Sequence, residues 1–260
     1  MSDTNARSGP VLIVTAGGQN PNILINALHG SFADVVVLRE KPESKAVFFS
    51  RRMRKLGLVT TIGQFATMIA SKFGKRFTGK RAAEILRDHG ADDRDNPEVQ
   101  MIATDSINTP AAIAQIRKLS PAVVLLVSCR MLKRETLAAM PCPVLNFHAG
   151  ITPHYRGLMG GYWSRINDDE ANFGATVHLV DPGVDTGDIL YQARMRPLGG
   201  DTMHTYPLLQ TAASVEIVTR AVEDALSGDL RPQPCLGPSQ QWYHPPVWTW
   251  LWNGVTRGIW

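Results

Sequence analysis

Two polar side chains stand at the end of an apolar run in the middle of the chain. Asn146 and His148 are separated by one residue, so in the strand predicted from Val144 both side chains project to the same side. An amide donor beside an imidazole suits attack on a carbonyl, because the amide steadies a developing oxyanion while the imidazole handles a proton. Asp185, in the loop after the next predicted strand, could set the tautomer of the imidazole. An Asn-x-His pair alone also fits a structural role.

These side chains need a sheet that ends beside them, and the hydrophobic pattern predicts one. Short apolar, β-branched runs alternate with segments whose apolar residues recur at helical spacing. The alternation is typical of an α/β fold, Rossmann-like, with a mostly parallel twisted sheet buried under helices on both faces. The predicted strands are 11–15, 35–38, 99–103, 122–127, 144–147, 174–180 and 188–192. The predicted helices are 22–28, 81–89, 110–119, 134–140, 161–167 and 205–226.

The length of 260 residues allows one large domain, or a domain with a small appendage. We predict a flexible N-terminus over 1–9 and a catalytic domain over 10–228 that contains a basic helical insert at about 41–95. The remaining residues, 229–260, form a Pro-rich tail with five of the six Trp, which we expect to be irregular. That tail could pack on the core, cap the acceptor pocket, form a homodimer interface or lie at a membrane surface.

The formal net charge of +4 is unevenly distributed. Ten Lys or Arg fall between Lys41 and Lys80 against a single acid, Glu43. Within this basic segment, one face of a predicted helix carries four apolar residues, Ile62, Phe65, Ile69 and Phe73. A segment like this can attract phosphates, an anionic cofactor, nucleic acid or an acidic membrane surface, and it can equally be a solvated helical face.

Cysteine content and hydropathy bear on the compartment. The three cysteines form no C-x-x-C pair, which argues against a disulfide framework and against a cysteine zinc site. The first residues lack the apolar core of a signal peptide, and no apolar run approaches the length of a membrane span. We therefore predict a cytoplasmic protein, without a transmembrane segment and without a metal.

Two separated segments resemble the catalytic core of the folate-dependent formyltransferases, the family of glycinamide ribonucleotide transformylase, methionyl-tRNA formyltransferase and the nucleotide-sugar N-formyltransferases. Residues 146–157, N-F-H-A-G-I-T-P-H-Y-R-G, are similar to that family's N-x-H-x-S-x-L-P-x-Y/W-R-G signature. Residues 174–188 are similar to its G-x-T-x-H-x-V-x-x-x-x-D-x-G segment. The resemblance extends over about 11–196, with departures at Gly150, where the family usually has Ser, and at Thr152, where it often has Leu.

The resemblance implies a catalytic trio of Asn146, His148 and Asp185. Asn146 would hold the formyl oxygen, and His148 would stabilise the tetrahedral intermediate as a protonated donor. Asp185 would keep His148 charged and relay protons. The implied reaction moves a formyl group from 10-formyltetrahydrofolate to a primary amine of a small acceptor, phosphorylated or nucleotide-linked. The alternatives are a formyltetrahydrofolate hydrolase, with water as the nucleophile, and a non-catalytic folate-binding protein.

The same resemblance implies two sets of binding residues. The folate would contact a pterin-binding loop and the far wall of its pocket: Ser128, Cys129, Arg130, Met131, Leu132, Val180, Asp181 and Gly183. The acceptor would contact Gly17, Gly18, Gln19, Asn20, His154, Tyr155, Arg156, Gly157 and His178. We expect folate and a small amine as partners and do not favour nucleic acid, because the residues after 226 are too few for the C-terminal barrel of methionyl-tRNA formyltransferase.

Overall fold

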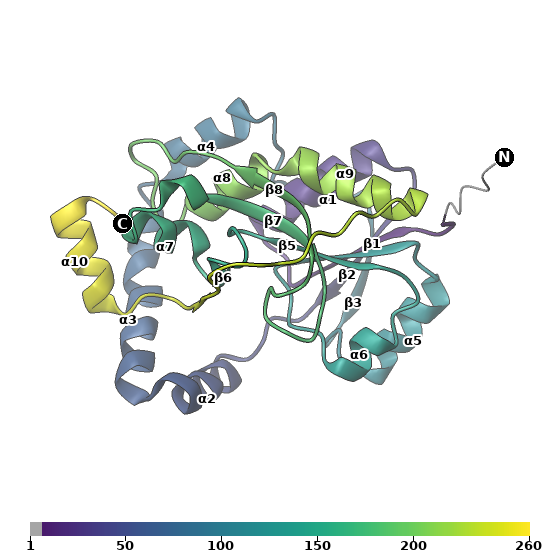
Figure 1. Ribbon diagram of the computed structural model, residues 1–260, viewed down its shortest axis with the longest axis horizontal. Coiled ribbons are helices and arrows are strands. Elements are labelled where there is room, and N and C mark those ends of the chain that lie inside the picture. Colours follow the sequence, from purple (N-terminus) through teal and green to yellow (C-terminus); the bar gives the residue numbers. More distant parts are fainter. Residues whose placement is uncertain (1–6) are drawn as a thin grey trace.

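A seven-stranded sheet forms the centre of the computed structural model, which describes residues 7–260 (Figure 1). The strands are β1 (Val11–Thr15), β2 (Val35–Glu40), β3 (Gln100–Thr104), β4 (Val123–Val127), β5 (Val144–His148), β7 (Gly174–Leu179) and β8 (Ile189–Arg194). Their order is β3-β2-β1-β4-β5-β7-β8. The first five are parallel, and β7 and β8 continue the sheet antiparallel. The predicted α/β fold with a mostly parallel sheet is confirmed.

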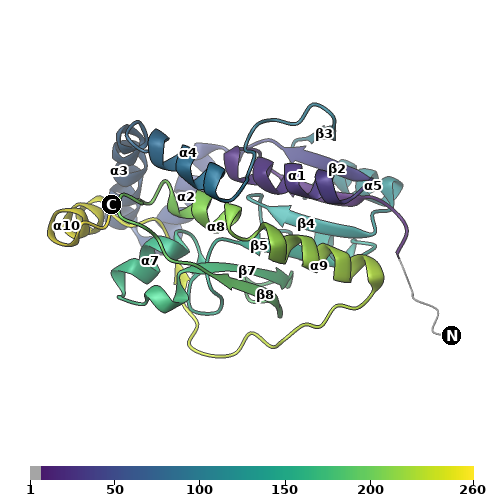
Figure 2. The ribbon, with the colours of Figure 1, turned by 90° about the horizontal axis from the view of Figure 1, so that it is seen from above.

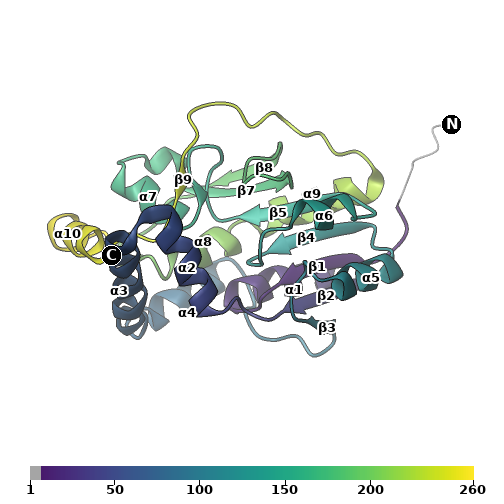
Figure 3. The ribbon, with the colours of Figure 1, turned by 90° about the horizontal axis from the view of Figure 1, so that it is seen from below.

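Helices cover both faces of this sheet (Figures 2 and 3). One face packs against α1 (Gln19–Ser31) and α9 (Val215–Ser227), and the other against α5 (Pro110–Leu119) and α6 (Arg134–Ala138). Successive residues of a strand alternate between the faces, so Ile13 packs toward α1 and Val14 toward α5. This two-sided burial explains the continuous apolar runs. The edge strand β3 is the exception to the predicted burial, because it has one neighbour and leaves Met101 45% exposed.

Further helices lie at the end of the sheet where the parallel strands finish. The predicted insert at about 41–95 contains α2 (Lys45–Leu56), α3 (Leu58–Lys75) and α4 (Gly79–Asp88). A third apolar cluster joins α4 to α7 (Gly160–Ile166), the 3-10 turn η1 (Glu170–Asn172) and α8 (Tyr206–Ala212). Ile85, Tyr162 and Phe173 are fully buried in that cluster. It supports the loops that follow β5.

The single helix predicted over 205–226 is wrong, because the chain breaks between α8 and α9 at Ala213 and Ser214. Ser214 makes a tighter hydrogen bond to the carbonyl of Thr211, three residues back, and ends the α-helical ladder. The two halves pack on different partners: Leu209 of α8 lies in the cluster around α7, whereas Val222 of α9 lies on the sheet. A continuous helix could not pack against both the α7 cluster and the sheet.

The C-terminal segment is more regular than the sequence predicts. Strand β9 (Gln241–Trp242) pairs in parallel with β6 (Arg156–Gly157), and α10 (Val247–Arg257) packs beside α3. The expectation of an irregular tail is therefore wrong for these two elements. Of the predicted flexible segment 1–9, residues 1–6 lie outside the described residues. Within residues 7–260, no helix has the length and apolar character that crossing a membrane requires.

Candidate active site

The predicted catalytic pair, Asn146 and His148, lies on β5, and β7 runs antiparallel beside that strand. In the antiparallel register of β5 with β7, Asn146 is opposite His178 and His148 is opposite Thr176. The period of two in β5 puts Asn146 and His148 on one face of the sheet, as the sequence predicts. The cross-strand register then brings His178, predicted as an acceptor contact, directly beside Asn146, where the Asn146 Nδ2 to His178 Nε2 distance is 3.0 Å.

Asp185 reaches this pair from the loop that joins β7 to β8. Its backbone has a left-handed φ of 50°, which turns the carboxylate back over the strand ends. Oδ1 accepts a hydrogen bond from Asn146 Nδ2 at 3.2 Å, and Oδ2 accepts one from the backbone amide of Gly157 at 2.9 Å. Oδ2 also lies 3.5 Å from Nδ1 of His148, and Oδ1 lies 3.5 Å from Nε2 of His178. The Asp185 carboxylate thus lies in contact with Asn146, His148, His178 and the Gly157 amide.

Burial disfavours the charged form of this carboxylate, whose side chain is 16% exposed. The adjacent rings of His148 and His178, together with the Gly157 amide, outweigh that effect and hold the pKa of Asp185 well below its usual range. Asp185 is therefore an ionised anchor at neutral pH.

The contacts of His148 specify where its hydrogens lie. Nε2 is 2.7 Å from the carbonyl oxygen of Tyr155, which can only accept, so Nε2 carries a hydrogen. Nδ1 faces the ionised carboxylate of Asp185, which also only accepts. The two ring nitrogens of His148 thus face two different acceptors, the Tyr155 carbonyl and the Asp185 carboxylate.

The amide of Asn146 is oriented by the same carboxylate. Its Nδ2 hydrogens point at Asp185 and at Nε2 of His178, and a flipped amide would set Oδ1 against a carboxylate oxygen. His178 can accept that hydrogen because its Nδ1 donates to the carbonyl of Leu179 at 2.7 Å. Among the described residues, the hydrogen bonds leave Oδ1 of Asn146 for a substrate. Oδ1 is a hydrogen-bond acceptor and cannot donate to a formyl oxygen. Nδ2 can donate to one only by giving up its hydrogen bond to Asp185 or to His178.

The departure at Gly150 has a structural reason. A Cβ at this position would lie 2.5 Å from Nε2 of His148 and 2.5 Å from the carbonyl oxygen of Tyr155. Glycine therefore leaves the space in which these two atoms meet. Thr176, which the sequence did not single out, holds the same turn, donating to the Gly150 carbonyl at 2.8 Å and accepting from the Thr152 amide at 3.2 Å.

The predicted acceptor residues after Pro153 are largely engaged in holding the site together. Tyr155 is 3% exposed, and its hydroxyl donates to Asp169 at 2.9 Å. Arg156 donates to the carbonyl of Val184 at 2.7 Å, and Gly157 donates to Asp185. These contacts clamp the loop that carries Asp185 against β6. Positioning of that carboxylate is their evident role in the structure.

Trp242, from the C-terminal segment, completes this wall. Its indole stacks on Tyr155 and Trp163, with ring centroids 6.0 Å and 4.6 Å apart, and its Nε1 donates to the carbonyl of His154 at 2.9 Å. Sequence reasoning missed this residue as part of the site, because nothing in local spacing links it to a strand some ninety residues earlier. Tertiary packing alone places Trp242 between Tyr155 and Trp163.

The predicted pterin-binding loop lies at the carboxyl end of β4. Ser128 has a left-handed φ of 51°, Met131 is 53% exposed, and Leu132 packs into the sheet core. Burial, with Glu40 nearby, raises the pKa of Cys129 to about 12, so its thiol stays protonated. The loop therefore offers one apolar side chain and backbone polar groups to the outside, and no reactive sulfur.

Glu40 anchors this loop and was missed by the sequence prediction. Its buried carboxylate accepts hydrogen bonds from the backbone amides of Arg130, at 2.6 Å, and Ile107, at 3.1 Å. The Arg130 amide is therefore occupied, and the Arg130 guanidinium donates to the carbonyls of Lys41 and Asp105. The sequence places Glu40 two residues after the apolar run 35–38, with Arg39 between, and no local signal marks it as buried.

On the opposite side of the Asp185 loop, Val180 is partly buried against the sheet core, and Asp181 closes the loop on itself. The Asp181 carboxylate accepts from the Thr186 hydroxyl at 2.7 Å and from the Gly183 amide at 3.0 Å. Asp181 therefore holds the shape of this turn, and its carboxylate is engaged in doing so.

Gly17 and Gly18 lie between the end of β1 and the start of α1. Both have left-handed φ angles, 83° and 122°, which suit glycine. The order of strands reverses between β1 and β4, and open α/β sheets bind ligands at this switch point. Gln19, in the first turn of α1 with Asn20, donates to Asp93 at 3.0 Å and accepts from Lys75 at 3.4 Å.

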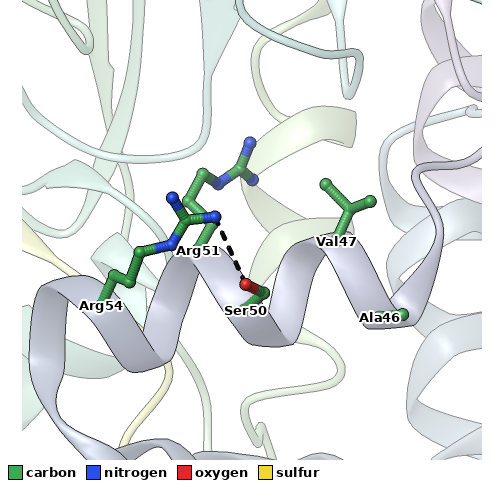
Figure 4. A pocket seen from close by; sticks show the side chains of 5 residues that line it. All are labelled: Ala46, Val47, Ser50, Arg51 and Arg54. Atoms are coloured by element: carbon green, nitrogen blue, oxygen red, sulfur yellow. Dashed lines mark hydrogen bonds between the residues drawn. The ribbon is translucent and has the colours of Figure 1, made fainter.

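A separate hollow lies beside α2, away from the Asn146 group. It has a volume of about 570 Å³ and is lined by Ala46, Val47, Ser50, Arg51 and Arg54, with Arg54 donating to Ser50 (Figure 4). None of the predicted site residues lines it. Over residues 7–260, no group of three or more His, Cys, Asp or Glu is placed to hold a metal ion.

Comparison with known proteins gives a family match over most of the chain. A family model described as Formyl transferase matches residues 11–222. Methionyl-tRNA formyltransferase from Roseiflexus sp. (strain RS-1) is 32% identical over 139 residues, which are 52% of this chain and 42% of that protein. The chain thus spans less than half the length of this curated relative.

Solved structures share the fold. Glycinamide ribonucleotide transformylase 1 from Symbiobacterium toebii matches with a TM-score of 0.55 at 19% identity, over 88% of this chain and 94% of that chain. A formyltransferase from Anoxybacillus kamchatkensis, solved in complex with UDP-4,6-dideoxy-4-formamido-L-AltNAc and tetrahydrofolate, matches with a TM-score of 0.50 at 20% identity. That match covers 67% of this chain and 88% of the other. At these identities the likeness shows the fold.

Proposed function

This chain belongs to the formyl transferase family, and on that premise we propose that it moves a formyl group from 10-formyltetrahydrofolate to a primary amine of a small acceptor. The observation that carries the proposal is the contact of Asp185 with both Asn146 and His148 at the end of β5. An ionised carboxylate, an imidazole and an amide held together at the end of β5 suit acyl transfer to nitrogen.

We assign the folate to the crevice between β1, β4 and the Asp185 loop. The exposed side chain of Met131 and the backbone of 128–132 fit a flat heteroaromatic ring with polar edges. The loop is held by Glu40, so it is formed before the ligand arrives. The A. kamchatkensis formyltransferase of this fold is complexed with tetrahydrofolate, which supports the same class of ligand here.

When bound, the formyl donor supplies an electrophilic carbon that a neutral amine attacks. The new carbon–nitrogen bond forms as the bond from that carbon to the folate nitrogen breaks, and the amine proton passes to the folate nitrogen. His148 meets the negative charge on the formyl oxygen by moving its Nε2 hydrogen away from the Tyr155 carbonyl. Oδ1 of Asn146 accepts a hydrogen bond from the amine, and Asp185 keeps the charge on His148.

The acceptor that we propose is phosphorylated or nucleotide-linked. The first turn of α1, opened by Gly17 and Gly18 at the same crevice, presents backbone amides of the kind that bind phosphate. The similar A. kamchatkensis structure holds a UDP-linked formamido sugar. Lys75 lies close by, hydrogen-bonded to Gln19, so cationic side chains of the insert are within reach of a phosphate.

The test measures formyl transfer from 10-formyltetrahydrofolate to a panel of nucleotide-linked and phosphorylated amines, with the formamide product detected by mass spectrometry. His148→Ala and Asn146→Ala should each lower the rate by about 10²- to 10⁴-fold. His89→Ala, outside the site on an exposed helix end, is the matched control and should leave the rate unchanged. Undiminished transfer in both site variants refutes the proposal, and formate release without any amine indicates a hydrolase instead.

A further inference from the structure

Helix α3 has its apolar side turned outward. Val59, Ile69 and Phe73 are 71%, 61% and 63% exposed, and Leu58 and Ile62 share the same side. The buried side of the helix is polar or small: Thr61, Gly63, Gln64, Thr67 and Ser71. An apolar stripe at helical spacing normally faces a core, so this orientation is the reverse of the ordinary one.

Specific contacts hold α3 in this orientation. Gln64 accepts a hydrogen bond from the buried guanidinium of Arg52 at 3.0 Å, and that guanidinium lies between the rings of Phe48 and Tyr243. The Ser71 carbonyl lies 2.6 Å from Nε2 of His204, which donates to it. Rotating the helix to bury its apolar side would break these contacts and leave a buried cation without partners. The exposed apolar side is therefore built into the fold.

Helix α10 extends the exposed apolar surface. It packs beside α3 at the end of the molecule opposite α5 (Figures 1 and 3). Gly63 allows the close approach, because a Cβ there would lie 2.5 Å from the Trp248 ring. Trp248, Leu251, Trp252 and Val255, spaced i, i+3, i+4 and i+7, are 50%, 45%, 69% and 76% exposed. We call the exposed apolar residues of the two helices the α3–α10 face.

The surroundings of the α3–α10 face are strongly basic. Lys72 and Lys75 lie in the last turn of α3, Arg76 follows it and Lys80 lies in the first turn of α4. The segment 41–80 holds ten Lys or Arg against the single acid Glu43. Residues 241–260, which include α10, contain no acid. Two copies of such a face would repel each other, so a second copy of this chain is a poor occupant, and so is another basic protein.

We propose that the α3–α10 face docks on an anionic lipid bilayer, with both helices lying in the plane of the membrane interface. Exposed tryptophans favour the boundary between headgroups and acyl chains. Lysine and arginine beside them extend their aliphatic stems along apolar surface and place the charge among anionic headgroups. The docking surface is a separate inference from formyl transfer, and it requires no membrane-spanning helix.

Docking would hold the site in a defined position relative to the bilayer. Arg52 connects α3 to Tyr243, and Lys55 donates to Gln241 at 3.1 Å. Gln241 begins β9, which pairs with β6 beside the amide that binds Asp185. The lipid-facing helices and the wall of the site are therefore parts of one packed unit, and no flexible linker separates them in the described chain.

The test is flotation of the full chain with phosphatidylcholine vesicles and with vesicles that also contain phosphatidylglycerol. The protein should float with the anionic vesicles alone and detach as salt is raised. Phe73→Ser with Trp252→Ser should lower binding by about 10-fold or more, because both side chains leave water on docking. Leu236→Ser, which changes a 79% exposed leucine outside the face, is the matched control and should bind as wild type does.

A second set of variants tests the contribution of the basic side chains to membrane binding. Lys72→Gln with Arg76→Gln should lower binding to anionic vesicles by roughly 30-fold, and Lys118→Gln on α5 should have little effect. Because every altered side chain is exposed, circular dichroism of each variant should match wild type. Equal binding to both kinds of vesicle, or binding to neither, overturns the proposal. A dimer in light scattering that Phe73→Ser with Trp252→Ser converts to a monomer overturns it in favour of a second copy.

Discussion

Gly150→Ala tests whether the contact between His148 and Tyr155 organises the site. The added Cβ would lie 2.5 Å from Nε2 of His148 and 2.5 Å from the Tyr155 carbonyl oxygen, two atoms that are themselves 2.7 Å apart. Carbon needs about 3.5 Å from such neighbours, so at least one of them must move by about 1 Å. Overpacking of this kind costs about 1–3 kcal/mol, and a 1 Å displacement of a catalytic group costs about 100-fold in rate.

The assay is urea and thermal unfolding of the variant, followed by formyl transfer. We expect the midpoint of thermal unfolding to fall by about 3–10 °C, since 1 kcal/mol corresponds to about 2–4 °C at this chain length. Gly30→Ala is the control: it adds the same methyl group near the end of α1, where no atom lies within 4 Å, and should be neutral or stabilising by up to about 1 kcal/mol. A Gly150→Ala protein with wild-type stability and rate would refute this reasoning.

Three further changes test other parts of the molecule. Asp185 has a pKa below its ordinary value of 3.8, so its charge stabilises the fold above about pH 4 and the gain is lost on acidification; Asp185→Asn should flatten this acid branch of unfolding curves. Burial, with Arg52 nearby, lowers the pKa of His244 to about 4, so the unfolded chain takes up a proton first. Wild type should therefore lose roughly 3 kcal/mol as pH falls from 6.5 to 4, and an equal loss in His244→Phe would contradict this. Arg81→Met removes the cation from the fully buried carboxylate of Asp201 and should cost about 3 kcal/mol in urea unfolding, whereas Arg87→Met, on an exposed pair, should cost almost nothing.

Local sequence pattern was enough to predict most strands of the sheet and the placement of Asn146 and His148. Helix α5 begins at Pro110, as predicted, because Thr109 caps it and accepts a hydrogen bond from the Ala112 amide. The shared side of Asn146 and His148 follows from strand geometry alone. Asp185 could be placed only through the family resemblance, because its left-handed φ and its clamp by Arg156 depend on residues distant in sequence.

What the sequence could not supply is the direction in which each helical face points. Spacing puts Ile62, Phe65, Ile69 and Phe73 on one side of a helix, and the ordinary expectation is that such a side is buried. In the fold Phe65 packs against Phe48 and Phe49, whereas the other three side chains are exposed. The opposite side carries Gln64, the hydrogen-bond partner of the buried Arg52 guanidinium. Gln64 and Ser71 are fixed on the buried side by Arg52 and His204, and spacing within the helix does not report these contacts. Periodicity defines a face, and long-range polar contacts decide whether that face meets the core or the solvent.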